Sequence, residues 1–199
     1  MASLMKKRTF GREGSLGIIL IFCIASTGFI NPRFVTGDGT RDLLSATAIV
    51  ALLAIGMAPV MIMRHIDLSI ASTVGFSAWL VADFCAKNPS FTWWQCFVIG
   101  GAVGIAVGVI NGLLVAGLRL PSLVVTLGTL YIVRGGVYVV SNSVDYNAQE
   151  MPPSLLSLGQ KTFAGLLPFP FLMVIILMVV VAWYMKYTKA GRDCYAIGS

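Results

Sequence analysis

Long apolar runs alternate with short polar segments along this chain. Several of the runs reach the roughly 18 apolar residues that a helix needs to cross a bilayer, and they contain few charges. The six runs cover residues 14–30, 43–63, 68–84, 97–118, 120–136 and 166–184. The pattern predicts an all-α fold, a polytopic transmembrane helix bundle with about six membrane segments.

Composition excludes a soluble domain. The chain has 199 residues, of which 57% are hydrophobic and 11% are charged, whereas soluble domains carry about 25% charged residues. Its basic start followed by an apolar run could be a cleaved signal peptide. Because more membrane segments follow and no A-x-A site is evident, we favour an uncleaved first transmembrane helix.

The fifth run, LPSLVVTLGTLYIVRGG (120–136), differs from the others. Its uninterrupted part, 120–133, would make roughly 21 Å of helix, which is too short for a hydrocarbon core of about 30 Å. The segment must therefore continue through Arg134, Gly135 and Gly136 into VYVVS, or turn back. We expect a broken or re-entrant segment surrounded by protein or by a water-filled cavity.

The distribution of Lys and Arg predicts the orientation. With six alternating segments, nine basic residues fall on the side of the N-terminus and four on the other, and Arg134 lies in the membrane. The nine are Lys6, Lys7, Arg8, Arg12, Arg64, Arg119, Lys186, Lys189 and Arg192. The excess predicts cytoplasmic N- and C-termini. The net charge of +6 is thus explained by topology and requires no nucleic acid.

This topology divides the chain into three parts. Residues 1–13 form a basic cytoplasmic N-terminus, 14–184 a transmembrane domain, and 185–199 a cytoplasmic segment. Trp93 and Trp94 precede the fourth segment, where indole rings favour the membrane interface.

Residues for catalysis or metal binding are scarce. The chain has one histidine, His65, and four scattered cysteines that we interpret as small apolar side chains. No P-loop, catalytic triad or carboxylate pair is evident. We therefore expect no catalytic residue, no metal site and no cofactor bound by this chain.

Four polar residues in or beside the apolar runs are candidates for a pathway. Asp67 either caps the third segment, which we favour, or lies at a pore mouth. Asn111 either hydrogen-bonds across helices or lines the pathway. Thr126 and Thr129 either bond their own helix backbone or line the pathway.

Arg134 is the one basic residue within an apolar run. A charge inside a membrane is costly and is often functional. Three interpretations are open. The side chain can extend from the outer end to the headgroups, pair with a carboxylate in the polar loop 141–164, or contact a substrate.

Four glycines in the fourth run are spaced four residues apart and share one helix face, which favours close approach of another helix. They are Gly100, Gly104, Gly108 and Gly112.

Three blocks of the sequence resemble the permease subunits of monosaccharide ABC importers, the family of ribose, xylose, arabinose, galactose and rhamnose permeases. The blocks are HIDLSIAS (65–72), INGLLVAGLRLPSLVVTLGTLYIVRGGVYVVS (110–141) and YTKAGRDCYAIGS (187–199). They occur in the family's order, and the resemblance covers about residues 43–199.

The resemblance implies a permease without catalytic residues. Its partners would be a cytoplasmic ABC ATPase that binds ATP, a second permease copy or paralogue, a periplasmic sugar-binding protein and membrane lipid. The last block would lead into the cytoplasmic coupling helix that docks on the ATPase. The candidates for that approach are Lys189, Gly191, Arg192 and Tyr195; positive-inside anchoring also explains the basic residues.

Members of that family usually exceed 300 residues, so the resemblance implies the N-terminal part of a permease. An inert truncated fragment or half of a split permease is therefore an alternative. An ion-coupled secondary transporter is a weaker one, because it would require ionisable residues in mid-membrane. Without its usual partners, the glycine face of residues 100–112 predicts poor stability or association with another copy.

Overall fold

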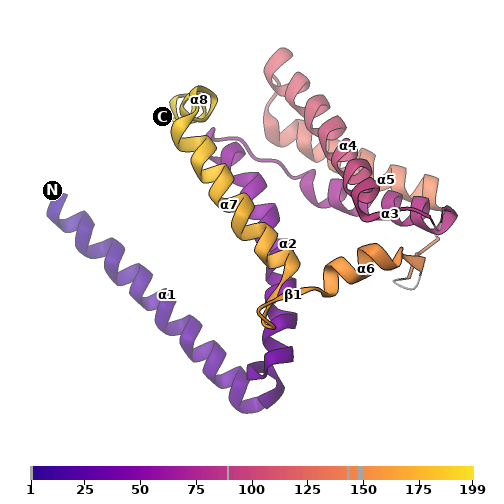
Figure 1. Ribbon diagram of the computed structural model, residues 1–199. Helices are drawn as coiled ribbons and strands as arrows, with labels where there is room; N and C mark the ends of the chain where they lie inside the picture. Colours follow the sequence, from indigo (N-terminus) through magenta and orange to yellow (C-terminus); the bar gives the residue numbers. More distant parts are fainter. Residues whose placement is uncertain (1, 89, 143, 148–149) are drawn as a thin grey trace.

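The computed structural model describes residues 2–88, 90–142, 144–147 and 150–199 (Figure 1). Lys6, Lys7, Arg8 and Arg12, on which the orientation depends, have side chains outside the described part. The elements in chain order are α1 (Ala2–Ile30), the 3₁₀ helix η1 (Pro32–Val35), α2 (Gly37–Ile62), α3 (Ile70–Lys87), α4 (Trp93–Gly112), the π-helical turn η2 (Leu113–Gly117), α5 (Ser122–Ser141), α6 (Pro153–Gln160), β1 (Thr162–Phe163), β2 (Leu167–Pro168), α7 (Phe169–Tyr187) and α8 (Lys189–Gly198).

The predicted all-α polytopic fold is confirmed. Four helices are long and apolar enough to cross a membrane: α2, α4 together with η2, α5 and α7. The first predicted segment is a shorter apolar helix, Gly14–Ile30 within α1. The third, α3, carries Asp83 and Lys87 in its last turns and is not among the four.

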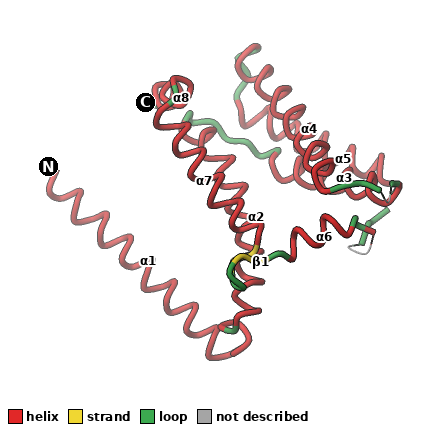
Figure 2. The backbone as a smooth tube through the Cα atoms, viewed as in Figure 1, coloured by secondary structure: helices red, strands yellow, loops and turns green. Residues whose placement is uncertain are grey.

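The helices pack in two groups (Figure 1, Figure 2). In one group α3 lies against α4 and α5; in the other α2 and α7 lie side by side and α8 covers the end of both. Loop 63–69 and helix α6 connect the groups. α1 runs apart from the rest and contacts mainly η1.

The expectation of a broken or re-entrant fifth segment is wrong. Helix α5 runs without interruption from Ser122 to Ser141 and includes Arg134, Gly135 and Gly136. Both glycines keep their amide donors, so a helix can pass through them although they cost some stability. The irregular backbone comes before α5, where η2 ends, Arg119 has a φ of 57° and Pro121 forms the N-cap.

Two further segments differ from the sequence expectations. The loop expected at 141–164 contains α6 and β1, and β1 pairs antiparallel with β2. The second helix begins at Gly37 instead of near residue 43, because the hydroxyl of Thr36 accepts a hydrogen bond from Gly39 N at 3.3 Å and caps it.

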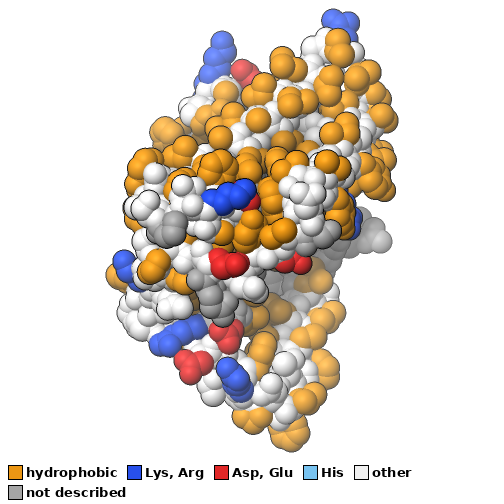
Figure 3. Space-filling model, turned by 90° about the vertical axis from the view of Figure 1, so that its right-hand side faces the viewer, with side chains coloured by type: hydrophobic (Ala, Val, Ile, Leu, Met, Phe, Trp, Pro, Cys, Tyr) orange, Lys and Arg blue, Asp and Glu red, His pale blue; other side chains and the backbone are white. Residues whose placement is uncertain are grey.

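Few side chains are buried among the residues whose exposure the structure describes. The hydrophobic core there consists of Ala48, Cys85, Cys96, Val125, Val174 and Met185. On the face drawn in Figure 3, hydrophobic side chains cover much of the upper part, and several Lys, Arg, Asp and Glu side chains lie lower down. Large exposed apolar surfaces face lipid or other protein, which agrees with membrane helices.

Candidate functional site

Asp67 lies in the loop between α2 and α3, shortly before α3 begins at Ile70. The Asp67 carboxylate Oδ1 accepts a hydrogen bond from Ser69 N at 2.8 Å and from the Ser69 hydroxyl at 2.6 Å. An aspartate that binds the amide two residues further on stabilises a turn before a helix. The favoured interpretation of Asp67 as the N-cap of this helix is wrong, because Ser69 is the N-cap of α3 and Asp67 holds the turn before it.

A chain of hydrogen bonds continues from Ser69 into the neighbouring helices. Asn111 Nδ2 on α4 donates to Ser69 Oγ at 2.9 Å, and Thr129 Oγ1 on α5 lies 2.6 Å from Asn111 Oδ1. Thr129 thus donates a hydrogen bond to Asn111, Asn111 donates one to Ser69, and Ser69 donates one to Asp67. We call these four residues the polar chain.

The polar chain is largely enclosed. Ser69 is 1% exposed and Asn111 is 6% exposed. Hydrogen bonds in such surroundings are strengthened by the low dielectric, and a missing partner there is costly. Each of the two residues has its polar side-chain atoms engaged, so the polar chain joins α3, α4 and α5 at one level.

A second set of bonds holds the loop to the start of α5. Thr126 Oγ1 lies 3.2 Å from Ile66 O and 2.8 Å from Ser122 O in its own helix. Ser122 Oγ accepts from Ile66 N at 3.3 Å and lies 3.3 Å from His65 Nδ1. The loop is thus bound to α5 through both side-chain and backbone atoms.

The structure therefore brings together four of the five pathway candidates, namely Asp67, Asn111, Thr126 and Thr129. The fifth, Arg134, lies further along α5 and lines a different recess with residues of α3. Sequence reasoning did not single out Ser69 and Ser122, which complete these bonds. Ser69 lies in the block HIDLSIAS and Ser122 in the block 110–141, but serines in apolar helices carry no distinctive signal alone.

The glycine face of α4 is mostly open. A Cβ placed on Gly100 would lie 3.8 Å from Val81 of α3, but one on Gly104, Gly108 or Gly112 would meet nothing within 4 Å. Among the described residues, only the first of the four glycines thus faces a neighbouring helix.

Helix α8 contains the four candidates for ATPase coupling. The Thr188 hydroxyl caps it by accepting from Gly191 N at 3.0 Å, and Arg192 Nη1 donates to Tyr187 O at 3.2 Å. A Cβ on Gly191 would lie 2.5 Å from the Met185 and Tyr184 carbonyl oxygens. Only glycine permits α8 to turn so closely against α7.

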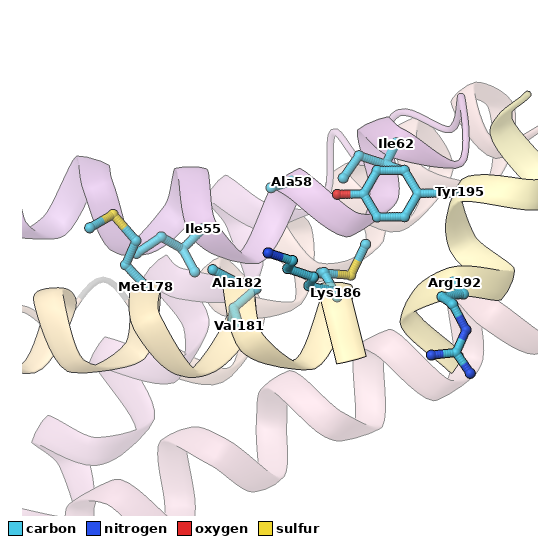
Figure 4. A pocket seen from close by; sticks show the side chains of 10 residues that line it. Ile55, Ala58, Ile62, Met178, Val181, Ala182, Lys186, Arg192 and Tyr195 are labelled. Carbon is cyan, nitrogen blue, oxygen red and sulfur yellow. The ribbon is translucent and has the colours of Figure 1, made fainter. Parts of the chain in front are cut away.

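A recess of about 570 Å³ separates α2, α7 and α8 at this end. Tyr195 of α8 lies beside Ile62 of α2, while the guanidinium of Arg192 points away from both (Figure 4). Lys189, Arg192 and Tyr195 are exposed, whereas Gly191 is buried. Gly191 therefore lets α8 pack closely on α7, and the other three residues leave their side chains exposed.

Two further contacts went unnoticed in the sequence. Cys85 and Cys96 are both buried, with their sulfur atoms 3.4 Å apart between α3 and α4. Tyr146 donates to Asp83 at 2.6 Å. In the described part of the chain, no group of three or more His, Cys, Asp or Glu side chains could hold a metal ion.

The comparisons that find a match all identify permease components of transport systems. A family model described as "Branched-chain amino acid transport system / permease component" matches residues 39–199. The chain is 34% identical over 198 residues to the autoinducer 2 import system permease protein LsrC of Enterobacter sp. (strain 638), covering all of this chain and 55% of that protein.

Other relatives carry the same name. The LsrC protein of Klebsiella pneumoniae is 33% identical over 198 residues, covering all of this chain and 55% of its own length. That of Yersinia pestis (strain Pestoides F) is 32% identical over 187 residues, or 94% of this chain and 52% of its own. The chain thus spans about half the length of these relatives. No solved structure matches it.

Proposed function

We propose, from the premise that this chain belongs to the family of branched-chain amino acid transport system permease components, that it forms part of the membrane pathway of an ATP-driven importer. The solute would be a monosaccharide or a similarly small polyhydroxylated molecule. The observation that carries this proposal is the family match over residues 39–199, which contains every helix from α3 to α8.

The solute class has two supports. The HIDLS, NG-to-RGG and GR-to-YAIG blocks resemble monosaccharide permeases, and the relatives described above are named for import of autoinducer 2. The importer would take its solute from a periplasmic binding protein, which would supply much of the selectivity.

We assign a positioning role to Asp67, Asn111, Thr126 and Thr129. Asn111 and Thr129 bond each other, Asn111 and Asp67 Oδ1 bond Ser69, and Thr126 bonds the backbone. A side chain whose donors and acceptors are already paired in a buried site offers little to a passing solute. The polar chain would instead hold α3, α4 and α5 as one unit that forms a wall of the pathway.

Helix α8 would be the contact to a cytoplasmic ATPase subunit, which would bind and hydrolyse ATP. Its exposed Lys189, Arg192 and Tyr195 would meet that subunit, and Gly191 would keep α8 in place on α7. Because α8 also touches the end of α2, movement of the ATPase would be transmitted to both membrane helices. This is the differential binding that alternating access requires.

The orientation follows from this role. Residues 1–13 and 185–199 would lie in the cytoplasm and 14–184 within a bacterial inner membrane, in contact with lipid and with a second permease copy or paralogue. Arg64, Lys186, Lys189 and Arg192 would then share the cytoplasmic side.

Uptake measurements test the proposal. The gene is deleted, and uptake of labelled ribose, xylose, arabinose, galactose, rhamnose and autoinducer 2 is compared with that of the parent strain. We expect loss of uptake of at least one solute, which in the parent persists with a protonophore and stops on ATP depletion. Uptake that stops with the protonophore while ATP is maintained would indicate an ion-coupled transporter. Unchanged uptake of all six would indicate an inert fragment.

A further inference from the structure

A recess of about 470 Å³ lies between α3 and α5, away from the polar chain. Its volume is within the range of about 300–1,000 Å³ typical of small-molecule sites. Its lining includes Phe76, Trp79, Arg134, Tyr138 and Asp145. The lining combines one cation, one anion and three aromatic rings.

The two charged groups in the recess are unpaired. Within the described residues, neither Arg134 nor Asp145 makes an ion pair or a side-chain hydrogen bond, although both line the same recess. The other acid–base neighbours behave differently: Arg41 binds Asp38 at 3.1 Å and Lys87 binds Asp83 at 2.7 Å. The donors of Arg134 and the acceptors of Asp145 therefore remain available to a ligand.

The aromatic wall is held in a defined orientation. The Trp79 indole donates from Nε1 to Val144 O at 3.1 Å, and its ring lies 6.3 Å from that of Tyr146. The Tyr146 hydroxyl in turn donates to Asp83 at 2.6 Å, and this bond raises the pKa of the Tyr146 phenol.

Asp145 stands between these two anchors. Val144 on one side is bound to Trp79, and Tyr146 on the other side is bound to Asp83. A loop residue whose two neighbours are both fastened loses little freedom when it binds a ligand. The Asp145 carboxylate thus has a restricted position at the recess and forms no ion pair within the described residues.

The position of Arg134 favours a wet or protein-covered recess over lipid. Arg134 is seven residues before the end of α5 at Ser141, which is roughly 10 Å along the helix axis. An unpaired arginine this deep in a span is costly in hydrocarbon. Together with the open acceptors of Asp145, this indicates a surface that faces a polar pathway.

We infer that the α3–α5 recess is a contact site for an uncharged polyhydroxylated solute on its way through the membrane, with Arg134 and Asp145 binding hydroxyl groups and Trp79 packing against the apolar face of the ring. This rests on the proposed function for the class of solute. The chemistry fits because a hydroxyl can accept from the guanidinium and donate to the carboxylate.

The test uses tryptophan fluorescence of the full chain in lipid nanodiscs. Trp93, Trp94 and Trp183 are 46%, 53% and 60% exposed and are changed to Phe, so that Trp79 is the sole reporter. The probes are ribose, xylose, arabinose, galactose, rhamnose and autoinducer 2, each titrated through the millimolar range. We expect a saturable change with at least one probe, and none in a protein that keeps only Trp183.

Variants then assign the change to the recess. Arg134→Gln and Asp145→Asn should each weaken binding about tenfold, the expected effect of losing a charge-assisted hydrogen bond. Arg33→Gln serves as the matched control, because Arg33 is an exposed arginine in η1, distant in contacts from α3 and α5. Arg134→Lys should keep part of the affinity, and circular dichroism must show unchanged helicity.

The outcomes separate this inference from the proposed function. The inference is overturned if Trp79 fluorescence changes with none of the six probes. It is also overturned if Arg134→Gln and Asp145→Asn bind the probe as tightly as the parent protein does. Binding at the recess combined with unchanged uptake after gene deletion overturns the proposed function instead. Uptake that is ATP-dependent yet unaffected by Arg134→Gln overturns only the inference.

Discussion

The two helix groups are held together by different interactions. α3, α4 and α5 share side-chain hydrogen bonds through Ser69, Asn111 and Thr129. Between α2 and α7, by contrast, no side-chain hydrogen bond is found in the described part of the chain. The side chains with which these two helices line their shared recess are apolar except for Lys186 at the end of α7. α8 is joined to this second group by the close approach of Gly191 to α7.

The difference separates a fixed unit from one that can shift. Lipid is as apolar as the helix surfaces, so apolar contact alone specifies little about how two membrane helices align. A buried hydrogen bond requires its two partners at one level, whereas apolar ridges allow small sliding movements of the kind found in shear motions. We therefore expect α3–α5 to move as one unit and α2, α7 and α8 to adjust when a partner binds α8.

The largest effect is expected at Gly191, where α8 packs against α7. Gly191→Ala places a Cβ 2.5 Å from backbone atoms of Met185 and Tyr184, so α8 must move away from α7. Overpacking of this kind costs about 1–3 kcal/mol. We expect protease cleavage near residue 188 and loss of co-purifying ATPase, with unchanged solute binding. Normal ATPase binding by the variant would show that the close contact of Gly191 with α7 is not needed for coupling to the ATPase.

A smaller loss is expected in the polar chain. Asn111→Leu keeps a similar volume but removes two buried hydrogen bonds, while the Ser69 and Thr129 hydroxyls keep Asp67 Oδ1 and Val125 O as partners. The loss of two bonds costs about 1–3 kcal/mol. The free energy of unfolding, measured by titration with sodium dodecyl sulfate, should fall while cleavage near residue 188 stays unchanged. If Asn111→Leu increased protease cleavage near residue 188 as much as Gly191→Ala does, the two helix groups would not be independent.

Removal of one end of the polar chain should cost less. Thr129→Val deletes the hydroxyl that lies 2.6 Å from Asn111 Oδ1, and single interhelical bonds in membranes average about 0.6 kcal/mol. In combination with Asn111→Leu its effect should largely disappear, because the partner is already lost. Full additivity in the double variant would show that the two side chains act independently.

The smallest effect is expected on the open glycine face. A Cβ on Gly104 meets nothing within 4 Å, and Ala is favoured over Gly within helices by up to about 1 kcal/mol. Gly104→Ala should therefore leave stability unchanged or raise it slightly in the same titration. A clear loss of stability would mean that another helix, from a second copy or a partner, packs on this face.

The sequence predicted the helical fold and most of the residues of interest, but not which of them meet. Asp67, Asn111, Thr126 and Thr129 are conspicuous because polar groups are rare in apolar runs. Their association depends on contacts between residues far apart in the chain, which no local pattern specifies. Ser69 was missed for the same reason, since a serine is common near a helix start.

The fifth segment shows a second limit. Arg134 with two glycines indicated a break, yet the helix continues because glycine keeps its backbone donor and the following VYVVS restores apolar length. The discontinuity lies at 118–121 instead, where the proline precludes continuation of the preceding helix. Of the two outcomes left open for this run, the structure shows continuation into VYVVS and not a turn back, so only the expected break is wrong.

Hydrogen–deuterium exchange of the full chain in lipid nanodiscs tests the separation of the two groups most directly, with the parent protein compared with Asn111→Leu and Gly191→Ala. We predict that Asn111→Leu speeds amide exchange at the starts of α3 and α5 and leaves α8 unchanged. Gly191→Ala should speed exchange in α8 and at the end of α7 and leave α3–α5 unchanged. Faster exchange in both groups from either substitution would contradict the account.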